Sequence, residues 1–133
     1  MKILMTVDPE IPVPPLQYGG IERIVDGLAH EYTNLGHEVI MLAHPDSSCS
    51  GVQRVIGWKG KTASMKKDIL SNARQLFQVA KRFNPDVIHS FSRLLYLYPI
   101  LLCSKYNVVQ CYQRAISARS TQLGQFLCQN RLQ

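Results

Sequence analysis

The chain has 133 residues, of which 46% are hydrophobic and 18% are charged, which is the balance of a folded globular protein. This length suits one domain with its own core, and it excludes a disordered chain and a two-domain enzyme within these residues. Fifteen Lys and Arg residues against nine Asp and Glu residues give a net charge of +6, which favours anionic partners such as nucleotides or phospholipid surfaces.

Short apolar runs alternate with a helical pattern in the first part of the chain. Residues 2–7 are almost all apolar, which predicts a strand buried on both faces. Four prolines between positions 9 and 15 exclude a regular helix there and predict a stiff, extended loop. From Ile21 apolar residues recur every three or four positions, which predicts an amphipathic helix that ends at Gly36. Residues 39–43 then predict a second strand, parallel to the first.

The middle of the chain continues this alternation. Residues 52–56 predict a short third strand, and a longer helix is expected from about residue 64 to Phe83. Three basic residues recur every seven positions on its outer face, namely Lys67, Arg74 and Lys81. We name them the basic stripe, which is either a plain solvated face or a surface for anionic membrane.

The last third of the chain predicts two further strands, at residues 86–90 and 108–112. Between them, residues 93–105 predict a helix that is interrupted near Pro99. Residues 116–133 contain few apolar positions and predict a weakly anchored tail. The order of elements therefore predicts an α/β domain, a Rossmann-like doubly wound parallel sheet.

Targeting and redox signals are weak. Residues 1–7 contain too few apolar positions for a secretory signal, so a cytoplasmic protein is expected. The longest apolar run, residues 94–103, is too short for a membrane span. The cysteines are Cys49, Cys103, Cys111 and Cys128. None of their spacings is typical of a zinc or redox site, so they are expected to be reduced, mostly buried thiols, with no metal.

Gly19 and Gly20 stand between the proline-rich loop and the first helix. Two glycines allow positive φ and let backbone amides come close to an anionic ligand. The helix start adds partial positive charge, and sheets of this class place phosphate sites at such turns. The pair therefore predicts either a phosphate-facing loop or an ordinary turn.

Several segments together resemble the N-terminal domain of the group 1, or family 4, glycosyltransferases: Pro14-Pro15, Tyr18–Arg23, Leu28-Ala29, Leu35–Val39 and Pro85–His89. The resemblance covers residues 1–115 and leaves 116–133 unassigned. It implies one half of a GT-B enzyme that moves a sugar from a nucleotide-sugar donor, with retention of anomeric configuration and no bound metal or other cofactor. The donor-binding C-terminal domain has no counterpart here, so the resemblance implies a truncated domain that is inactive alone.

The resemblance also implies roles for particular residues. Gly19 and Gly20 would face the donor diphosphate, and Glu22 would order the loop or contact the acceptor, unless it is only a first-turn acid. Many relatives have a histidine after the fifth strand, where this chain has Gln113, which can donate a hydrogen bond but cannot carry a proton. His89, at the end of the fourth strand, is the second catalytic candidate, with a structural role as its alternative.

Two arginines complete the predicted site. Arg93 and Arg114 follow the fourth and fifth strands, where they would meet anionic groups of a ligand or lie solvated at the surface. Two histidines of the first helix and its turn, His30 and His37, are expected to be solvated. The implied partners are a nucleotide-sugar and a sugar or lipid-linked acceptor, with peripheral membrane contact through the basic stripe.

Other functions fit less well. A stand-alone, non-catalytic Rossmann-like binding module is the main alternative, favoured by Gln113 and the unassigned tail. A dinucleotide oxidoreductase is disfavoured because the adjacent glycines lack the spaced three-glycine pattern. A nucleic-acid partner is not expected, because docking motifs and stacking aromatic residues are missing.

Overall fold

The computed structural model describes residues 1–62, 64–103, 105–112, 122 and 126. Gln113 and Arg114 lie outside the described residues, as does nearly all of the predicted tail. The elements in chain order are β1 (Lys2–Thr6), α1 (Gly20–Asn34), β2 (Glu38–Ala43), β3 (Arg54–Gly57), α2 (Lys66–Phe83), β4 (Val87–Ser90), α3 (Leu94–Cys103) and β5 (Asn107–Gln110).

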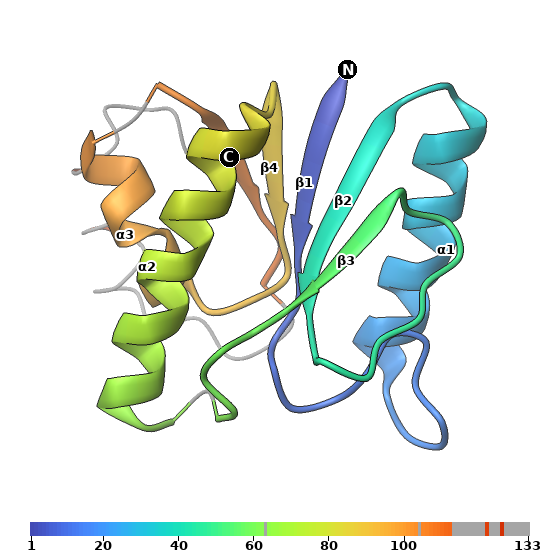
Figure 1. Cartoon of the computed structure of the whole chain (residues 1–133), viewed down its shortest axis with the longest axis horizontal. Coiled ribbons are helices and arrows are strands. Elements are labelled where there is room, and N and C mark those ends of the chain that lie inside the picture. Colours follow the sequence, from blue (N-terminus) through green and yellow to red (C-terminus); the bar gives the residue numbers. More distant parts are fainter. Residues whose placement is uncertain (63, 104, 113–121, 123–125, 127–133) are drawn as a thin grey trace.

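The five strands form one parallel sheet in the order β3-β2-β1-β4-β5. Helix α1 covers one face of this sheet, and helices α2 and α3 cover the other (Figure 1). The prediction of a doubly wound parallel sheet is therefore confirmed. Because all strands run in one direction, their carboxyl ends share one edge of the sheet.

Each face of the sheet has its own hydrophobic core. On the α1 face, Met5 of β1 packs in one cluster with Val25 of α1. On the other face, Leu4 packs with Leu76 of α2 and Tyr96 of α3. Successive residues of a strand point to opposite faces, and here both faces are covered. This is why β1 is a continuous apolar run rather than an alternating one.

Helix α1 ends in a hydrogen-bonded turn that requires glycine. The His37 N–H donates to the Tyr32 carbonyl at 3.0 Å, and the Gly36 N–H donates to the Thr33 carbonyl at 2.9 Å. Gly36 has φ of +80°, which favours a residue without a side chain. The two bonds form a Schellman motif, so the predicted stop at Gly36 is confirmed.

Helix α3 differs from its prediction. It runs unbroken through Pro99, whereas an interruption was expected there. Proline at this position removes the bond to the carbonyl of Leu95, but the neighbouring α3 residues Tyr96 and Ile100 are buried in the core and hold the helix in place. Helix α3 is the most apolar helix and has only 10 residues, and among the described residues no helix has the length and hydrophobicity to span a bilayer.

Candidate functional site

The strand order places a topological switch point between β1 and β4, because their connections leave toward opposite faces of the sheet (Figure 1). Sheets of this kind are expected to bind ligands at the carboxyl ends of these two strands, and we name this place the β1–β4 crevice. The loops after the two strands are joined directly. Thr6 Oγ1 and Ser92 Oγ share a buried hydrogen bond of 2.9 Å, and the Arg93 N–H donates to Asp8 Oδ1 at 3.2 Å. Asp8 is only 8% exposed. Arg93 is thus held at the mouth of the crevice, on the side where the sequence predicted it.

Several buried polar atoms gather near the carboxyl ends of β4 and β5. Arg93 Nε, Tyr96 Oη, Gln110 Oε1 and Tyr112 Oη are buried and have no hydrogen-bond partner among the described residues. An unsatisfied buried polar group costs about 1–3 kcal/mol, so such groups mark a place that a polar ligand or water can fill. Burial also raises the pKa of Tyr96, and the neighbouring Asn72 side chain partly opposes this rise, so the Tyr96 hydroxyl stays protonated beside Asn72.

Asp8, Ser92, Tyr96 and Gln110 were not singled out from the sequence. The available signal was that Asp8, Ser92 and Gln110 are polar residues at or just after the ends of apolar strands. Tyr96 carried no such signal, because it lies inside an apolar helix.

The two glycines of the loop have different surroundings. Gly19 precedes α1 with φ of 153°, and a Cβ atom there would lie 2.7 Å from Pro15 Cβ and 2.8 Å from Glu22 Oε2. A Cβ atom at Gly20 would meet nothing within 4 Å. Gly19 is therefore required by local packing, while Gly20 leaves open space in front of the helix start. Glu22, only 6% exposed, packs against Gly19.

The proline-rich loop is anchored in its middle. Val13 is buried, its N–H donates to Ser47 Oγ at 2.9 Å, and its carbonyl accepts a 2.9 Å bond from the Ser48 N–H. Closer to the glycines, Leu16 and Tyr18 are 91% and 88% exposed. The loop thus presents two large apolar side chains to solvent beside the helix start.

His89 lies on the α1 face of the sheet, where it is paired with Met5 of β1. Its Nδ1 is 3.0 Å from Tyr32 Oη, and its Nε2 is 3.1 Å from Cys111 Sγ. Its ring centroid lies 4.5 Å from that of Phe91. Burial lowers the pKa of His89. These contacts are those of a packed imidazole whose charged form is disfavoured by burial, and the catalytic role expected for His89 stays a prediction.

The predicted site residues form two groups. Gly19, Gly20 and Glu22 lie together at the start of α1, and Arg93 flanks the β1–β4 crevice just before α3. Gln113 and Arg114 are outside the described residues, so their roles stay predictions.

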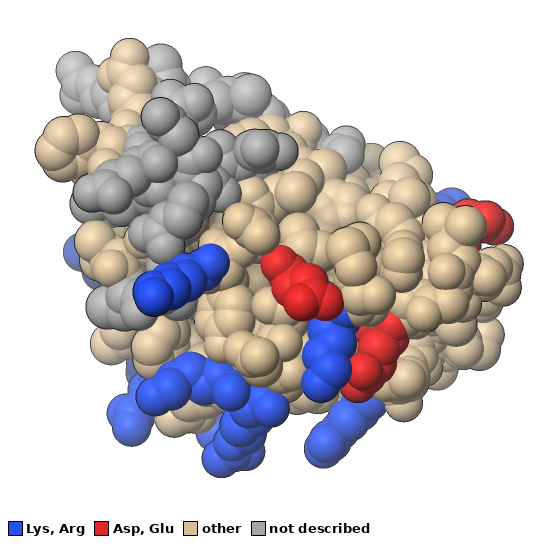
Figure 2. Space-filling view, turned by 90° about the horizontal axis from the view of Figure 1, so that it is seen from above, with Lys and Arg blue, Asp and Glu red and all other residues tan. Residues whose placement is uncertain are grey.

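Basic side chains gather along one side of the molecule (Figure 2). All three residues of the basic stripe are exposed on α2. A groove of about 590 Å³ lies between α2 and the β2–β3 edge, with Arg54, Lys59 and Arg82 among its lining residues. This surface is separate from the β1–β4 crevice.

Residues 18–115 match the family model described as Glycosyltransferase Family 4. The chain belongs to this glycosyltransferase family. The matched residues include the glycine pair and every other residue predicted for the site. Among curated proteins, no relative matches the sequence.

Two solved structures are similar to this family 4 domain. A glycosyltransferase from Rickettsia africae ESF-5 has a TM-score of 0.63 and 21% identity, with 92% of this chain and 32% of that chain covered. MurG from Acinetobacter baumannii has a TM-score of 0.59 and 13% identity, with 95% of this chain and 39% of that chain covered. The domain therefore has the fold of one half of a GT-B glycosyltransferase and spans 32% and 39% of those two chains.

Proposed function

We propose that this domain is the acceptor-side half of a retaining glycosyltransferase that moves a sugar from a nucleotide-sugar to a sugar or lipid-linked acceptor. The observation that carries the proposal is the open start of α1 at Gly20, beside the β1–β4 crevice of a family 4 chain. The donor nucleotide would be bound mainly by a second domain. The cytoplasmic location expected from the sequence stays a prediction.

The start of α1 suits a diphosphate because its first N–H groups lack a side-chain cap. Gly19 is the N-cap residue and offers no side chain to accept a hydrogen bond. The first N–H groups of a helix have no partner within the helix, and together with the helix dipole they favour an anion. In transfer, these groups would stabilise the negative charge that develops on the departing nucleotide diphosphate.

Residues around the crevice would serve the acceptor and the anionic groups. Arg93, held through its N–H by Asp8, brings a guanidinium to the same edge of the sheet. Tyr96 and Gln110 provide a hydroxyl and an amide oxygen that are buried and unpaired among the described residues. Such groups hydrogen-bond well to sugar hydroxyls. Glu22, packed against Gly19, would keep the glycine turn in shape.

The proposal is tested by binding of nucleoside diphosphates to the 133-residue chain. Trp58 is the single tryptophan, is buried, and donates from Nε1 to the Val7 carbonyl just after β1, so its fluorescence reports on this edge. Because a second domain would supply most of the nucleotide contacts, we expect weak but saturable binding through the diphosphate, and the variant Gly20→Ala should weaken it at least several-fold by placing a methyl group in front of the backbone N–H groups.

The matched control is Gly27→Ala, the same change on the same helix, where a new Cβ atom also meets nothing within 4 Å. It should leave binding unchanged. Equal affinity in the wild type, Gly20→Ala and Gly27→Ala would overturn the assignment of the helix start. Sugar transfer by this chain alone would overturn the requirement for a second domain.

A further inference from the structure

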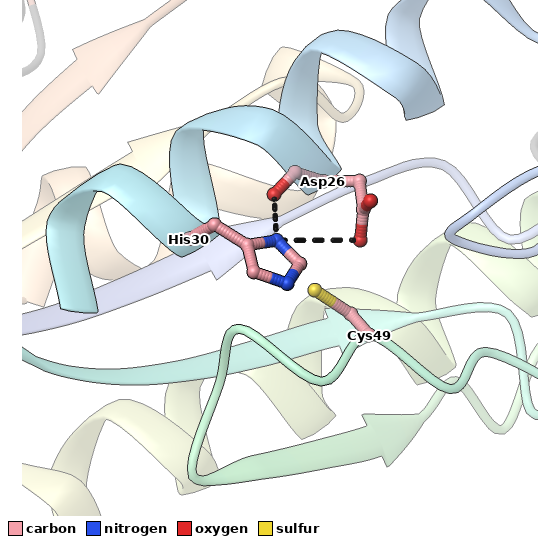
Figure 3. Close-up of side chains that lie close together, drawn as sticks. All are labelled: Asp26, His30 and Cys49. Carbon is pink, nitrogen blue, oxygen red and sulfur yellow. Dashed lines mark hydrogen bonds and ion pairs between the residues drawn. The ribbon is translucent and has the colours of Figure 1, made fainter. Parts of the chain in front are cut away.

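Three side chains from two separate parts of the chain meet at α1, away from the β1–β4 crevice. Asp26 and His30 are one turn apart on α1, and Cys49 lies in the loop between β2 and β3. Positions four residues apart on a helix share one side, so both α1 side chains can face that loop. One ligand atom from each residue lies within 4.8 Å of the other two (Figure 3).

We propose that Asp26, His30 and Cys49 form a site for a divalent transition-metal ion of the zinc class. Thiolate and imidazole ligands select zinc-like ions over magnesium or calcium, and a carboxylate oxygen is an accepted third ligand. A doubly charged ion would neutralise the carboxylate and the thiolate, so the partly buried site would carry no net charge. A fourth position would be filled by water or a nearby hydroxyl.

His30 is already oriented as a ligand. Its Nδ1 lies 2.8 Å from the backbone carbonyl oxygen of Asp26. A carbonyl can only accept, so Nδ1 carries the proton and Nε2 carries the lone pair. A hydrogen bond from the other ring nitrogen to a backbone carbonyl is the usual support of metal-binding histidines. Ser50 Oγ, 3.1 Å from Nε2, lies where it can donate to that lone pair or supply the fourth ligand.

Asp26 has an unused ligand atom. Its Oδ1 is buried, makes no hydrogen bond of good geometry among the described residues and lies 3.9 Å from His30 Nδ1, while the Asp26 carboxylate is also close enough to the Cys49 thiol to accept from it. Leaving such an atom unpaired is costly. A cation between Asp26, His30 and Cys49 would satisfy it.

The loop is shaped to hold Cys49 in place. Gly51 packs directly on α1, since a Cβ atom there would lie 2.7 Å from the His30 backbone nitrogen and 2.8 Å from its ring. The Thr33 hydroxyl donates to the Gly51 carbonyl on the next turn of α1. Cys49 itself is only 4% exposed. The site is therefore built by packing and does not depend on a mobile surface thiol.

A nucleophilic or redox role fits these residues less well. Burial, with the neighbouring Asp26 carboxylate, raises the pKa of Cys49 to about 12, so without a cation the thiol stays protonated and unreactive. When the metal binds, the Cys49 S–H bond breaks, its proton leaves to solvent and the sulfur bonds to the metal. The ion would tie the β2–β3 loop to α1. It would take no part in sugar transfer, which leaves the family expectation of metal-free transfer intact.

Cobalt titration of the reduced, metal-free chain tests the site. Co²⁺ bound to a thiolate gives a sulfur-to-metal charge-transfer band in the near ultraviolet, and Zn²⁺ should displace it. We expect the band to saturate at one Co²⁺ per chain and to be absent in Cys49→Ser. Loss of a residue that only supports a metal ligand weakens metal binding by about 10–100-fold. Cys49→Ser removes a ligand itself, so it should weaken Co²⁺ binding by at least this factor.

The matched control is Cys111→Ser. Cys111 Sγ also lies next to a histidine, 3.1 Å from His89 Nε2. Among the described residues, however, the only cluster of three potential metal ligands is the one that contains Cys49. Cys111→Ser should keep the full band. The N-terminal amine and His37 Nδ1, 3.4 Å apart, could also hold Co²⁺, but without a thiolate they give no such band.

A second readout covers the case that Cys49→Ser fails to fold. Asp26→Asn keeps the shape of the side chain and removes its charge, and it should lower Co²⁺ affinity and abolish the rise in melting temperature that Zn²⁺ causes in the wild type. The proposal is overturned if the wild type shows no charge-transfer band at saturating Co²⁺. It is also overturned if the band depends on Cys111 instead of Cys49.

Discussion

The substitution Gly19→Ala tests whether the glycine turn is held by packing. The backbone of Gly19 has φ of 153° and ψ of 79°, a conformation that side chains rarely adopt. Such backbone strain costs about 1–3 kcal/mol. The new methyl group would also come 2.7 Å from Pro15 Cβ, and overpacking of this kind costs about 1–3 kcal/mol.

These costs overlap, because a shift of the turn relieves both. We therefore expect Gly19→Ala to lower the free energy of unfolding by about 2–4 kcal/mol. For a chain of this size, about 4 °C of melting temperature corresponds to 1 kcal/mol, so the melting temperature should fall by roughly 8–16 °C. Glu22 belongs to the same contact, since its carboxylate would also meet the new methyl group.

The assay is urea unfolding followed by Trp58 fluorescence and by circular dichroism. Gly20→Ala and Gly27→Ala serve as controls, because neither new Cβ atom meets any atom within 4 Å. Alanine is favoured over glycine within a helix, so the controls should match the wild type or gain up to about 1 kcal/mol. If Gly19→Ala unfolds within about 0.5 kcal/mol of the wild type, the packing argument is wrong.

Burial lowers the pKa of His89 below its ordinary value of 6.5, so the unfolded chain binds that proton more tightly. The stabilisation that comes from neutral His89 should be fully present above about pH 6.5 and be lost as the pH falls through the pKa of His89 in the folded protein. The free energy of unfolding should change by at most about 1.4 kcal/mol per pH unit in this range. His89→Gln should remove this pH dependence, which urea midpoints measured above and below pH 6.5 would show. Reversing the charges of Lys67, Arg74 and Lys81 should abolish sedimentation with anionic vesicles; if the wild type does not sediment with them at low salt, the membrane prediction fails. Tyr96→Phe removes a buried hydroxyl that has only the Asn72 side chain beside it, so it should cost at most about 1.5 kcal/mol of stability while weakening acceptor binding. A large loss of stability would show instead that the hydroxyl serves the fold.

The helices and strands of the fold were predictable because the pattern of apolar residues along the chain agrees with which faces are buried in the folded protein. The strands β1 and β2 are covered on both faces, so their sequences are continuous apolar runs. Gly36 and Asn84 mark helix ends because their positive φ suits few other residues. The interruption predicted at Pro99 was wrong because the buried side chains of α3, such as Tyr96 and Ile100, pack in the core and hold the helix although one backbone hydrogen bond is missing.

The sequence by itself determined the element order, the parallel sheet and the glycine pair at the start of α1, since these depend on residue types close together in the chain. Only the tertiary structure separated Gly19 from Gly20, because Pro15 and Glu22 close around one of them. Likewise, His30 is exposed to solvent as expected, with 43% of its side chain accessible, but it also bonds to Asp26 and Ser50 beside Cys49, which only the structure shows. Cys49 lies 19 residues after His30, a spacing with no local meaning, and only the folding of the β2–β3 loop onto α1 brings the two together.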